Sequence, residues 1–212
     1  MFVNFKAAQV LPEATVLEKH RMFQVESGGM ALETPVRRFV NLSLIGFMGV
    51  GKSSVGRMIA SALHMHMVDT DDLIELRAGM PIPSIFASLG ERGFRECERE
   101  VVLGLEGLRD SVISTGGGLA ANADNLRSLR THSLVVCLWA GPEVIWERVR
   151  HQSHRPLLQT QDPQERIREL LAQREPFYRQ ADVMVNTECR NLQEVAQHVI
   201  HHARLAGIST TI

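Results

Sequence analysis

Short apolar runs alternate with stretches of helical periodicity from residue 41 to the C-terminal region. The apolar runs cover residues 42–45, 65–68, 112–114, 134–139 and 183–185. The helical stretches cover residues 52–63, 91–108, 142–150, 164–175 and 191–205. Strands that alternate with helices predict an α/β fold, in which helices cover both faces of a parallel sheet.

Residues 1–38 differ from the rest of the chain. They have no sustained hydrophobic period, and they contain Pro12, the Gly28-Gly29 pair and Pro35. We interpret this segment as an N-terminal extension that is flexible or partly helical. Residues 39–212 are then expected to form one domain.

The composition narrows the class of protein. Hydrophobic residues make up 44% and charged residues 22% of the 212 residues, as in an ordinary globular domain. The formal net charge of −1 gives no overall basic field for nucleic acid or a membrane surface. No apolar run approaches the roughly 18 residues of a membrane span. The three cysteines show no metal-like spacing, so we expect reduced thiols in a cytoplasmic protein, with Cys137 in the core.

Residues 46–53 read G-x-x-x-x-G-K-S between a predicted strand and a predicted helix. The glycines allow backbone N–H groups to surround phosphate oxygens at a positive helix N-terminus. Lys52 is expected to bridge the β- and γ-phosphates, and Ser53 is expected to bind Mg²⁺. The motif predicts nucleotide binding, but it does not distinguish a kinase from a switch or a motor.

Acidic residues follow the second predicted strand. Asp69, Asp71 and Asp72 lie at its carboxyl end, where ligands of open α/β sheets gather. One carboxylate can hold the metal and another can orient an acceptor hydroxyl. For Asp72 we favour helix N-capping, and for Asp69 and Asp71 we favour a functional role.

Other features are ambiguous when each is taken alone. Arg95 and Glu98 share a helical face, and their spacing favours a solvated ion pair. Glycines 116–118 follow a strand and indicate a tight turn or close approach to a ligand. Arg155 lies in a loop and could close over a nucleotide, or it could be an ordinary surface residue. Arg174 could reach a ligand or cap its own helix.

Taken together in their order along the chain, these motifs resemble the shikimate kinase family over residues 41–206. The matching motifs are 46–54, Asp69-Thr70-Asp71, Gly93-Phe94-Arg95 with Glu98, Gly116–Gly118, 155–158, and Arg174 with Tyr178. The resemblance implies a three-layer P-loop kinase fold with a five-stranded parallel sheet, a mobile lid and a helical substrate-binding region. It also implies transfer of phosphate from ATP to shikimate, giving 3-phosphoshikimate in aromatic amino-acid biosynthesis.

Residue roles follow from the same resemblance. The implied catalytic residues are Lys52, Asp71 and Arg155. The implied ATP contacts are Gly49, Val50, Gly51, Lys52, Ser53, Ser54, Arg148 and Arg155. The implied shikimate contacts are Asp71, Arg95, Gly117 and Arg174, with the two arginines on the carboxylate and Glu98 orienting Arg95. Ser53 and Asp69 are implied to serve Mg²⁺.

Three alternative functions are less well supported. A related P-loop kinase that acts on gluconate or a nucleotide is disfavoured by residues 93–95, the glycine triplet and Arg174, which match the shikimate site. A catalytically silent binding module should have lost Lys52, Asp71 or Arg95, and all three are present. A GTPase switch is disfavoured, because no N-K-x-D motif occurs. Small molecules are the expected partners, and a monomer is the expected state. Where the family often has a proline against the adenine, Asn191 is followed by Leu192.

Overall fold

The computed structural model describes residues 37–151, 156–158 and 160–208. Its strands are β1 (Asn41–Ile45), β2 (His66–Asp69), β3 (Ser111–Ser114), β4 (Ser133–Trp139) and β5 (Val183–Asn186). They form one sheet in the order β2-β3-β1-β4-β5, and all neighbouring pairs are parallel. The five predicted strands and their parallel arrangement are confirmed.

The helices cover more of the chain than the sequence pattern indicates. They are α2 (Lys52–Ala62), α3 (Thr70–Ala78), α4 (Ile82–Leu105), α5 (Ala123–His132), α6 (Pro142–Val149), α7 (Pro163–Tyr178) and α8 (Leu192–Leu205), with 3-10 turns η1 (Leu119–Ala121) and η2 (Pro156–Leu158). The predicted bounds 91–108 are wrong for α4, because this helix begins at Ile82 and ends at Leu105. A kink at Gly90, with φ 65° and ψ −174°, interrupts its hydrophobic period.

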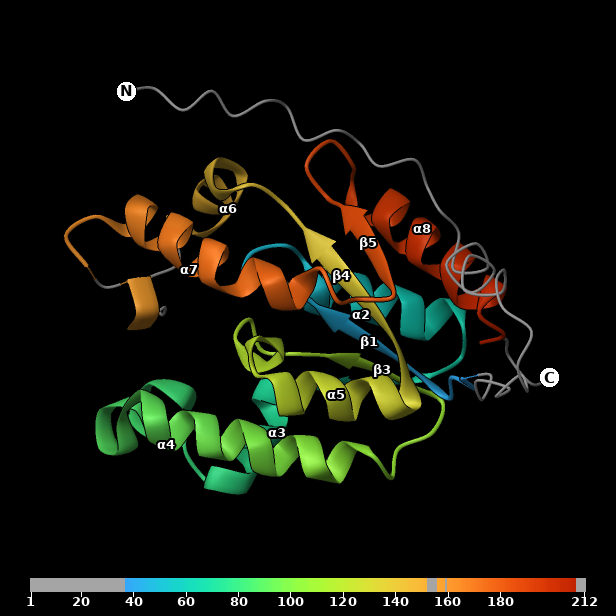
Figure 1. Ribbon diagram of the computed structural model, residues 1–212, viewed down its shortest axis with the longest axis horizontal. Coiled ribbons are helices and arrows are strands. Elements are labelled where there is room, and N and C mark those ends of the chain that lie inside the picture. The colour runs from blue at the N-terminus through green and yellow to red at the C-terminus, as the bar shows by residue number, and fades with distance from the viewer. Residues whose placement is uncertain (1–36, 152–155, 159, 209–212) are drawn as a thin grey trace, which may run out of the picture. The chain divides into compact units, whose positions relative to one another are not determined.

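The connections place helices on both faces of the sheet (Figure 1). Parallel strands are joined by right-handed crossovers, so the direction of each connection sets the face of its helix. The step from β1 to β2 runs opposite to the step from β3 to β4. Helices α2 and α5 therefore lie on opposite faces, and α8 packs against α2. The connections change direction between the neighbouring strands β1 and β3, and ligands of open parallel sheets bind beyond the carboxyl ends of strands at such a point.

The core lies in and around the central strands. Leu42, Leu44 and Ile45 of β1 have no exposed surface, and β4 is buried along nearly its whole length. Strands covered on both faces read as continuous apolar runs, which explains why the pattern revealed them. Cys137 on β4 is buried, as expected, and burial raises the pKa of its thiol to about 12.

Only the last two residues of the predicted extension, Arg37 and Arg38, lie within the described part of the chain. Arg37 makes an ion pair with Asp182 at 2.6 Å and donates to the carbonyl of Ser133. These contacts attach residue 37 to the region where β4 begins. In the described part of the chain, no helix is both long enough and apolar enough to span a membrane.

Candidate active site

The loop between β1 and α2 has the geometry of a phosphate-binding loop. Gly46 and Gly51 have φ angles of 134° and 95°, which side-chain-bearing residues rarely adopt. A Cβ at Gly46 would also lie 2.2 Å from the carbonyl oxygen of Leu138. The Nζ of Lys52 is buried against this loop and donates to the carbonyls of Gly46 and Phe47, at 3.0 and 2.8 Å.

A cavity of about 320 Å³ opens above this loop. It is lined by Met48, Gly49, Gly51, Lys52, Ser53, Ser54, Asp69, Asp71, Thr115, Gly117 and Arg148. The structure therefore brings most of the predicted ATP contacts together. Val50 differs, because its side chain is buried and does not line the cavity. We call this space the phosphate cavity.

Asp69 connects β2 to both the phosphate loop and α3. Its Oδ2 accepts a hydrogen bond from Ser53 Oγ at 2.7 Å, and its Oδ1 accepts one from the backbone N–H of Asp71 at 3.0 Å. Asp69 is thus the N-cap of α3, and the prediction that Asp72 caps this helix is wrong. The aspartate that ends the strand can reach the N–H two residues ahead, whereas Asp72 already lies inside the first turn.

Thr70 and Asp71, which follow Asp69, have different roles. The buried hydroxyl of Thr70 accepts a hydrogen bond from the backbone N–H of Gly116 at 2.8 Å. This bond ties the turn after β3 to the end of β2. Asp71 lines the phosphate cavity and also a second cavity on its other side. In the D-T-D sequence, Asp69 therefore caps a helix, Thr70 holds the turn after β3, and Asp71 forms part of the cavity wall.

Each glycine of the 116–118 triplet leaves room for a different neighbour. A Cβ at Gly116 would lie 2.5 Å from Asp71 Oδ1, and one at Gly117 would lie 3.0 Å from the backbone nitrogen of Met48. At Gly118 it would lie 2.5 Å from Nη1 of Arg95. The backbone of the triplet therefore lies close to three parts of the site, and there is no room for a side chain at any of the three positions without a shift of neighbouring atoms. Formation of a turn alone does not explain three glycines here.

Arg95 and Glu98 form a largely buried pair on α4. Arg95 Nη1 donates to Glu98 Oε2 at 2.7 Å, and only 1% of the Glu98 side chain is exposed. The expectation of a solvated pair is therefore wrong, because η1 and the glycine turn cover this face of the helix. Burial raises the pKa of Glu98, nearby Asp71 adds to the rise, and Arg95 opposes it.

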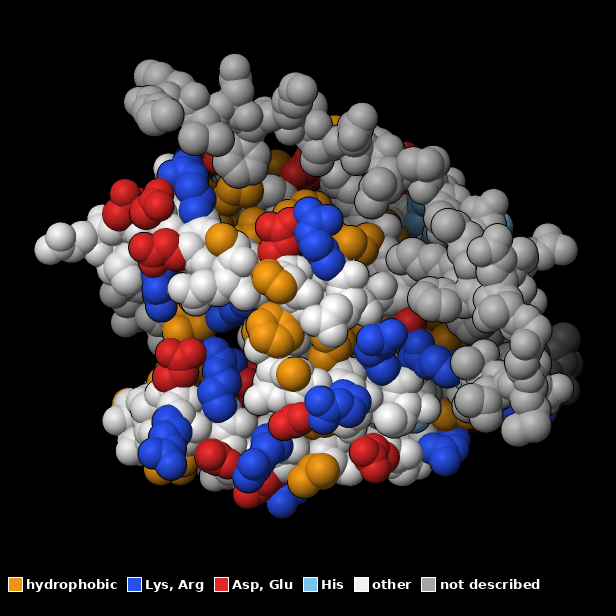
Figure 2. All heavy atoms as spheres, viewed as in Figure 1, with side chains coloured by type: hydrophobic (Ala, Val, Ile, Leu, Met, Phe, Trp, Pro, Cys, Tyr) orange, Lys and Arg blue, Asp and Glu red, His pale blue; other side chains and the backbone are white. Residues whose placement is uncertain are grey.

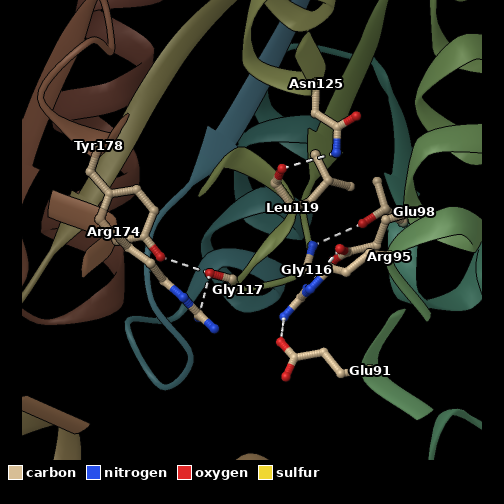
Figure 3. A network of polar contacts seen from close by, with 10 residues as sticks. Glu91, Arg95, Glu98, Gly116, Gly117, Leu119, Asn125, Arg174 and Tyr178 are labelled. Atoms are coloured by element: carbon tan, nitrogen blue, oxygen red, sulfur yellow. Dashed lines mark hydrogen bonds and ion pairs between the residues drawn. The ribbon is translucent and has the colours of Figure 1, made fainter. Parts of the chain in front are cut away.

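Arg174 on α7 points into the site and does not cap its own helix. Its Nη1 donates to the carbonyl of Gly117 at 3.0 Å, and the buried Tyr178 hydroxyl donates to the same oxygen at 2.7 Å. Its guanidinium also lies over the ring of Phe47, 5.1 Å from the ring centre. Figure 3 shows Arg174 and Arg95 on either side of Gly117, and both arginines line one cavity beside the turn after β3.

The second cavity has an apolar wall and a charged floor. It is lined by Met48, Asp71, Glu75, Ile82, Pro83, Phe86, Phe94, Arg95, Glu98, Gly116, Gly117, Gly118, Leu157 and Arg174. Figure 2 shows a hollow between α7 and α4 with charged side chains at its rim. We call this space the acceptor cavity. It shares Met48, Asp71 and Gly117 with the phosphate cavity, so the two spaces meet at Asp71.

Arg148 on α6 is held at the edge of the phosphate cavity. Its Nη1 and Nη2 donate to the hydroxyl and carbonyl of Thr187, at 2.9 and 2.7 Å. Thr187 in turn donates to the carbonyl of Trp139 at the end of β4. These bonds fix the plane of the guanidinium. Arg155, predicted as the lid residue, lies outside the described residues.

Sequence reasoning assigned no role to Thr70, Tyr178 or Thr187. Each acts by a hydrogen bond to a residue more than 30 positions away in the chain. A lone threonine or tyrosine carries no periodic signal of such a bond. Thr70 and Tyr178 lie within two of the matched family motifs, which is the signal that could have marked them, whereas Thr187 lies in none.

Comparison with protein families agrees with this geometry. A family model described as shikimate kinase matches residues 48–204. A shikimate kinase of Caldanaerobacter subterraneus is 44% identical over 168 residues, which are 79% of this chain and 98% of that protein. A shikimate kinase of Thermus thermophilus is 45% identical over 181 residues, which are 83% of this chain and 98% of that protein.

Among solved structures, the chain is similar to shikimate kinases and, more distantly, to a gluconokinase. A shikimate kinase from Acinetobacter baumannii in complex with shikimate has a TM-score of 0.76 and 35% identity, covering 81% of this chain and 96% of that chain. A gluconokinase from Sinorhizobium meliloti has a TM-score of 0.55 and 21% identity, covering 81% and 96%. At that identity the gluconokinase indicates a shared fold and no more.

Proposed function

The chain belongs to the shikimate kinase family, and we propose that it phosphorylates shikimate with ATP where its two cavities meet. The observation that carries the proposal is the pair of cavities that share Asp71, Met48 and Gly117. Direct phosphoryl transfer requires donor and acceptor to lie in line, with no water between them. Two connected spaces with one carboxylate at the junction suit that requirement.

The phosphate loop would bind the donor. Backbone N–H groups around the loop and the N-terminus of α2 favour the negative phosphates. Lys52 Nζ donates to two carbonyls of its own loop in this structure. When ATP binds, we propose that this ammonium turns to the phosphate oxygens and stabilises charge on the transferred group. Arg148, held by Thr187, would present its flat face to the adenine.

Ser53 and Asp69 fit a magnesium site. Mg²⁺ prefers oxygen ligands and usually takes only one or two protein groups besides phosphate and water. A serine hydroxyl and a carboxylate that already contact each other at 2.7 Å provide such a pair beside the loop. Bound there, Mg²⁺ would neutralise phosphate charge in the transition state. We therefore propose that ATP is used with this metal.

The acceptor cavity would hold shikimate by its two ends. Arg95 and Arg174 would bind the carboxylate, because a planar guanidinium fork matches carboxylate geometry. Asp71 would accept the proton of the hydroxyl that attacks the γ-phosphorus of ATP. A new phosphorus–oxygen bond to shikimate then forms as the bond to ADP breaks. The ring centroids of Phe86 and Phe94 lie 4.6 Å apart, and these two side chains would form an apolar wall for the ring of shikimate.

The substrate assignment can be tested directly. ADP release should be measured with ATP and Mg²⁺ against shikimate, gluconate and nucleoside monophosphates in parallel. Of these acceptors, we expect only shikimate to raise ADP release well above the background hydrolysis of ATP. Turnover of gluconate with no turnover of shikimate would overturn the assignment, and no turnover of any acceptor would support the silent binding module.

Arg95→Lys is expected to lower kcat/KM for shikimate despite keeping the charge. Lysine loses the two-pronged contact, and a charged hydrogen bond contributes about 1.5–3 kcal/mol, or roughly tenfold to hundredfold in kcat/KM. The matched control is Arg99→Lys, because Arg99 forms an exposed i,i+3 pair with Glu96 on the same helix. Equal kcat/KM in both variants would remove Arg95 from carboxylate binding.

Other expectations from the sequence remain predictions. The lid role of Arg155, the separate character of residues 1–38, the cytoplasmic location and the monomeric state belong to this group. Deletion of residues 1–38 is expected to leave kcat largely intact, since the residues that line both cavities lie downstream. A truncated protein that folds but has lost most of its kcat would contradict this prediction.

A further inference from the structure

Arg95 is bound by a second carboxylate besides Glu98. Its Nη2 donates to Glu91 Oε1 at 2.9 Å, while its Nη1 is held by Glu98 at 2.7 Å. Glu91 lies one helical turn before Arg95, directly after the kink at Gly90. Figure 3 shows Glu91 on the side of the guanidinium that faces away from Glu98. Both outer nitrogens of the arginine therefore already have an acidic partner.

The two carboxylates differ in how firmly they are held. The side chain of Glu98 is 1% exposed, whereas that of Glu91 is 54% exposed. Burial lowers the pKa of Arg95, but the two carboxylates together raise it above its ordinary value, and Glu98 contributes more than Glu91. Glu91 can turn its carboxylate into water at little cost, because exposed ion pairs contribute little to stability. Glu98 has no such alternative.

Space for this movement exists beside the acceptor cavity. A further cavity is lined by Glu91 and also by Arg95, Glu98, Gly118 and Arg174, which the acceptor cavity shares. Glu91 itself does not line the acceptor cavity. Arg95 thus stands between the two spaces, and Gly118 packs against its guanidinium from the turn after β3.

We propose that Glu91 is a placeholder that occupies Arg95 in the empty site and competes with the carboxylate of the substrate. The proposal rests on the proposed function, in which Arg95 binds that carboxylate. An arriving carboxylate needs the guanidinium and is repelled by a neighbouring negative charge. Since Glu98 is fixed by burial, Glu91 is the group that gives way. Glu91 thereby lowers the affinity for shikimate and raises the KM for shikimate.

The test compares Glu91→Gln with the parent enzyme. Glutamine keeps a similar shape and a hydrogen-bonding oxygen but removes the charge. Unit charges a few ångströms apart in a water-like medium interact by about 1 kcal/mol, which corresponds to about fivefold in affinity. We expect KM for shikimate, and its Kd from calorimetry, to fall by about that factor at low salt. Neither kcat nor KM for ATP should change by more than about twofold.

Two controls separate this effect from general changes in surface charge. Glu96→Gln removes a carboxylate that is 55% exposed and paired with Arg99 on the same helix, and it should leave KM unchanged. In 1 M salt, where the Debye length is about 3 Å, the gain in Glu91→Gln should shrink. Binding of the uncharged carboxamide of shikimate, which Glu91 does not repel, should gain less from Glu91→Gln than binding of shikimate does.

The possible outcomes are distinct. A parent enzyme that does not phosphorylate shikimate would refute the proposed function. A parent that does so, with KM and Kd unchanged or raised in Glu91→Gln, would refute the placeholder. A rise in KM would instead indicate that Glu91 positions Arg95 for the substrate. Matching melting temperatures of parent and variants would show that the comparison concerns binding and not folding.

Discussion

Replacing Asp71 with Asn is expected to lower kcat by about 10²–10⁴-fold, the range for loss of a general base. Asp71 lies where the phosphate and acceptor cavities meet, and Asn cannot take up the hydroxyl proton. The transition state of phosphoryl transfer is loose, so orientation of the hydroxyl contributes alongside proton removal, and we expect a loss toward the low end of this range. Steady-state ADP release at saturating shikimate and ATP measures the effect. Binding of ATP should survive, because the phosphate loop is unchanged.

Asp69→Asn provides the matched comparison for this result. Asp69 contacts Ser53 at 2.7 Å beside the phosphate loop and caps α3. Loss of its charge should raise the Mg²⁺ concentration needed for half-maximal rate, and excess Mg²⁺ should restore part of the activity. Asn still caps a helix well, so the fold should persist. The assignment of roles is wrong if both variants depend equally on Mg²⁺, or if Mg²⁺ restores Asp71→Asn instead.

The fold was predictable to the extent that its signals were local. Strands β1 and β4 are buried on both faces, so their apolar runs were plain in the sequence. The start of α4 was missed because Gly90 breaks its period. Helix α5 was missed because most of its residues are polar, and its buried apolar residues are only Leu126 and Leu129. Tertiary packing, which short windows of sequence do not contain, decides such helices.

The candidate site also has one part that the sequence revealed by a local signal and one part that it did not. The phosphate loop is a run of consecutive residues, so the sequence revealed it together with its lysine. The acceptor side depends on α4, the turn after β3, and α7, which meet only in the folded chain. Family resemblance supplied Arg95, Gly117 and Arg174 as a set. The helical spacing of Arg95 and Glu98 alone indicated a solvated pair, because spacing carries no information about what covers a helix face.

Gly116→Ala is expected to lower kcat/KM by roughly 100-fold, as displacement of a reacting group by about 1 Å can do. The added Cβ would lie 2.5 Å from Asp71 Oδ1 and 3.3 Å from Glu98 Oε1. Those atoms are the ends of side chains, so the clash can be relieved by turning the Asp71 carboxylate away from its position. The φ angle of Gly116 does not fall in the left-handed region, so alanine adds no backbone strain there.

A control and a double variant identify the cause of that loss. A methyl group added at Gly104 on α4 would meet open space, so Gly104→Ala should keep full activity and raise the free energy of unfolding by about 0.5–1 kcal/mol. If Gly116→Ala acts by displacing Asp71, the two changes share one target and their effects should not add. Gly116→Ala combined with Asp71→Asn should then be within a few-fold of Asp71→Asn alone. Fully multiplicative losses in kcat/KM would show that alanine at position 116 damages the site by a different route, such as movement of the turn that binds Thr70.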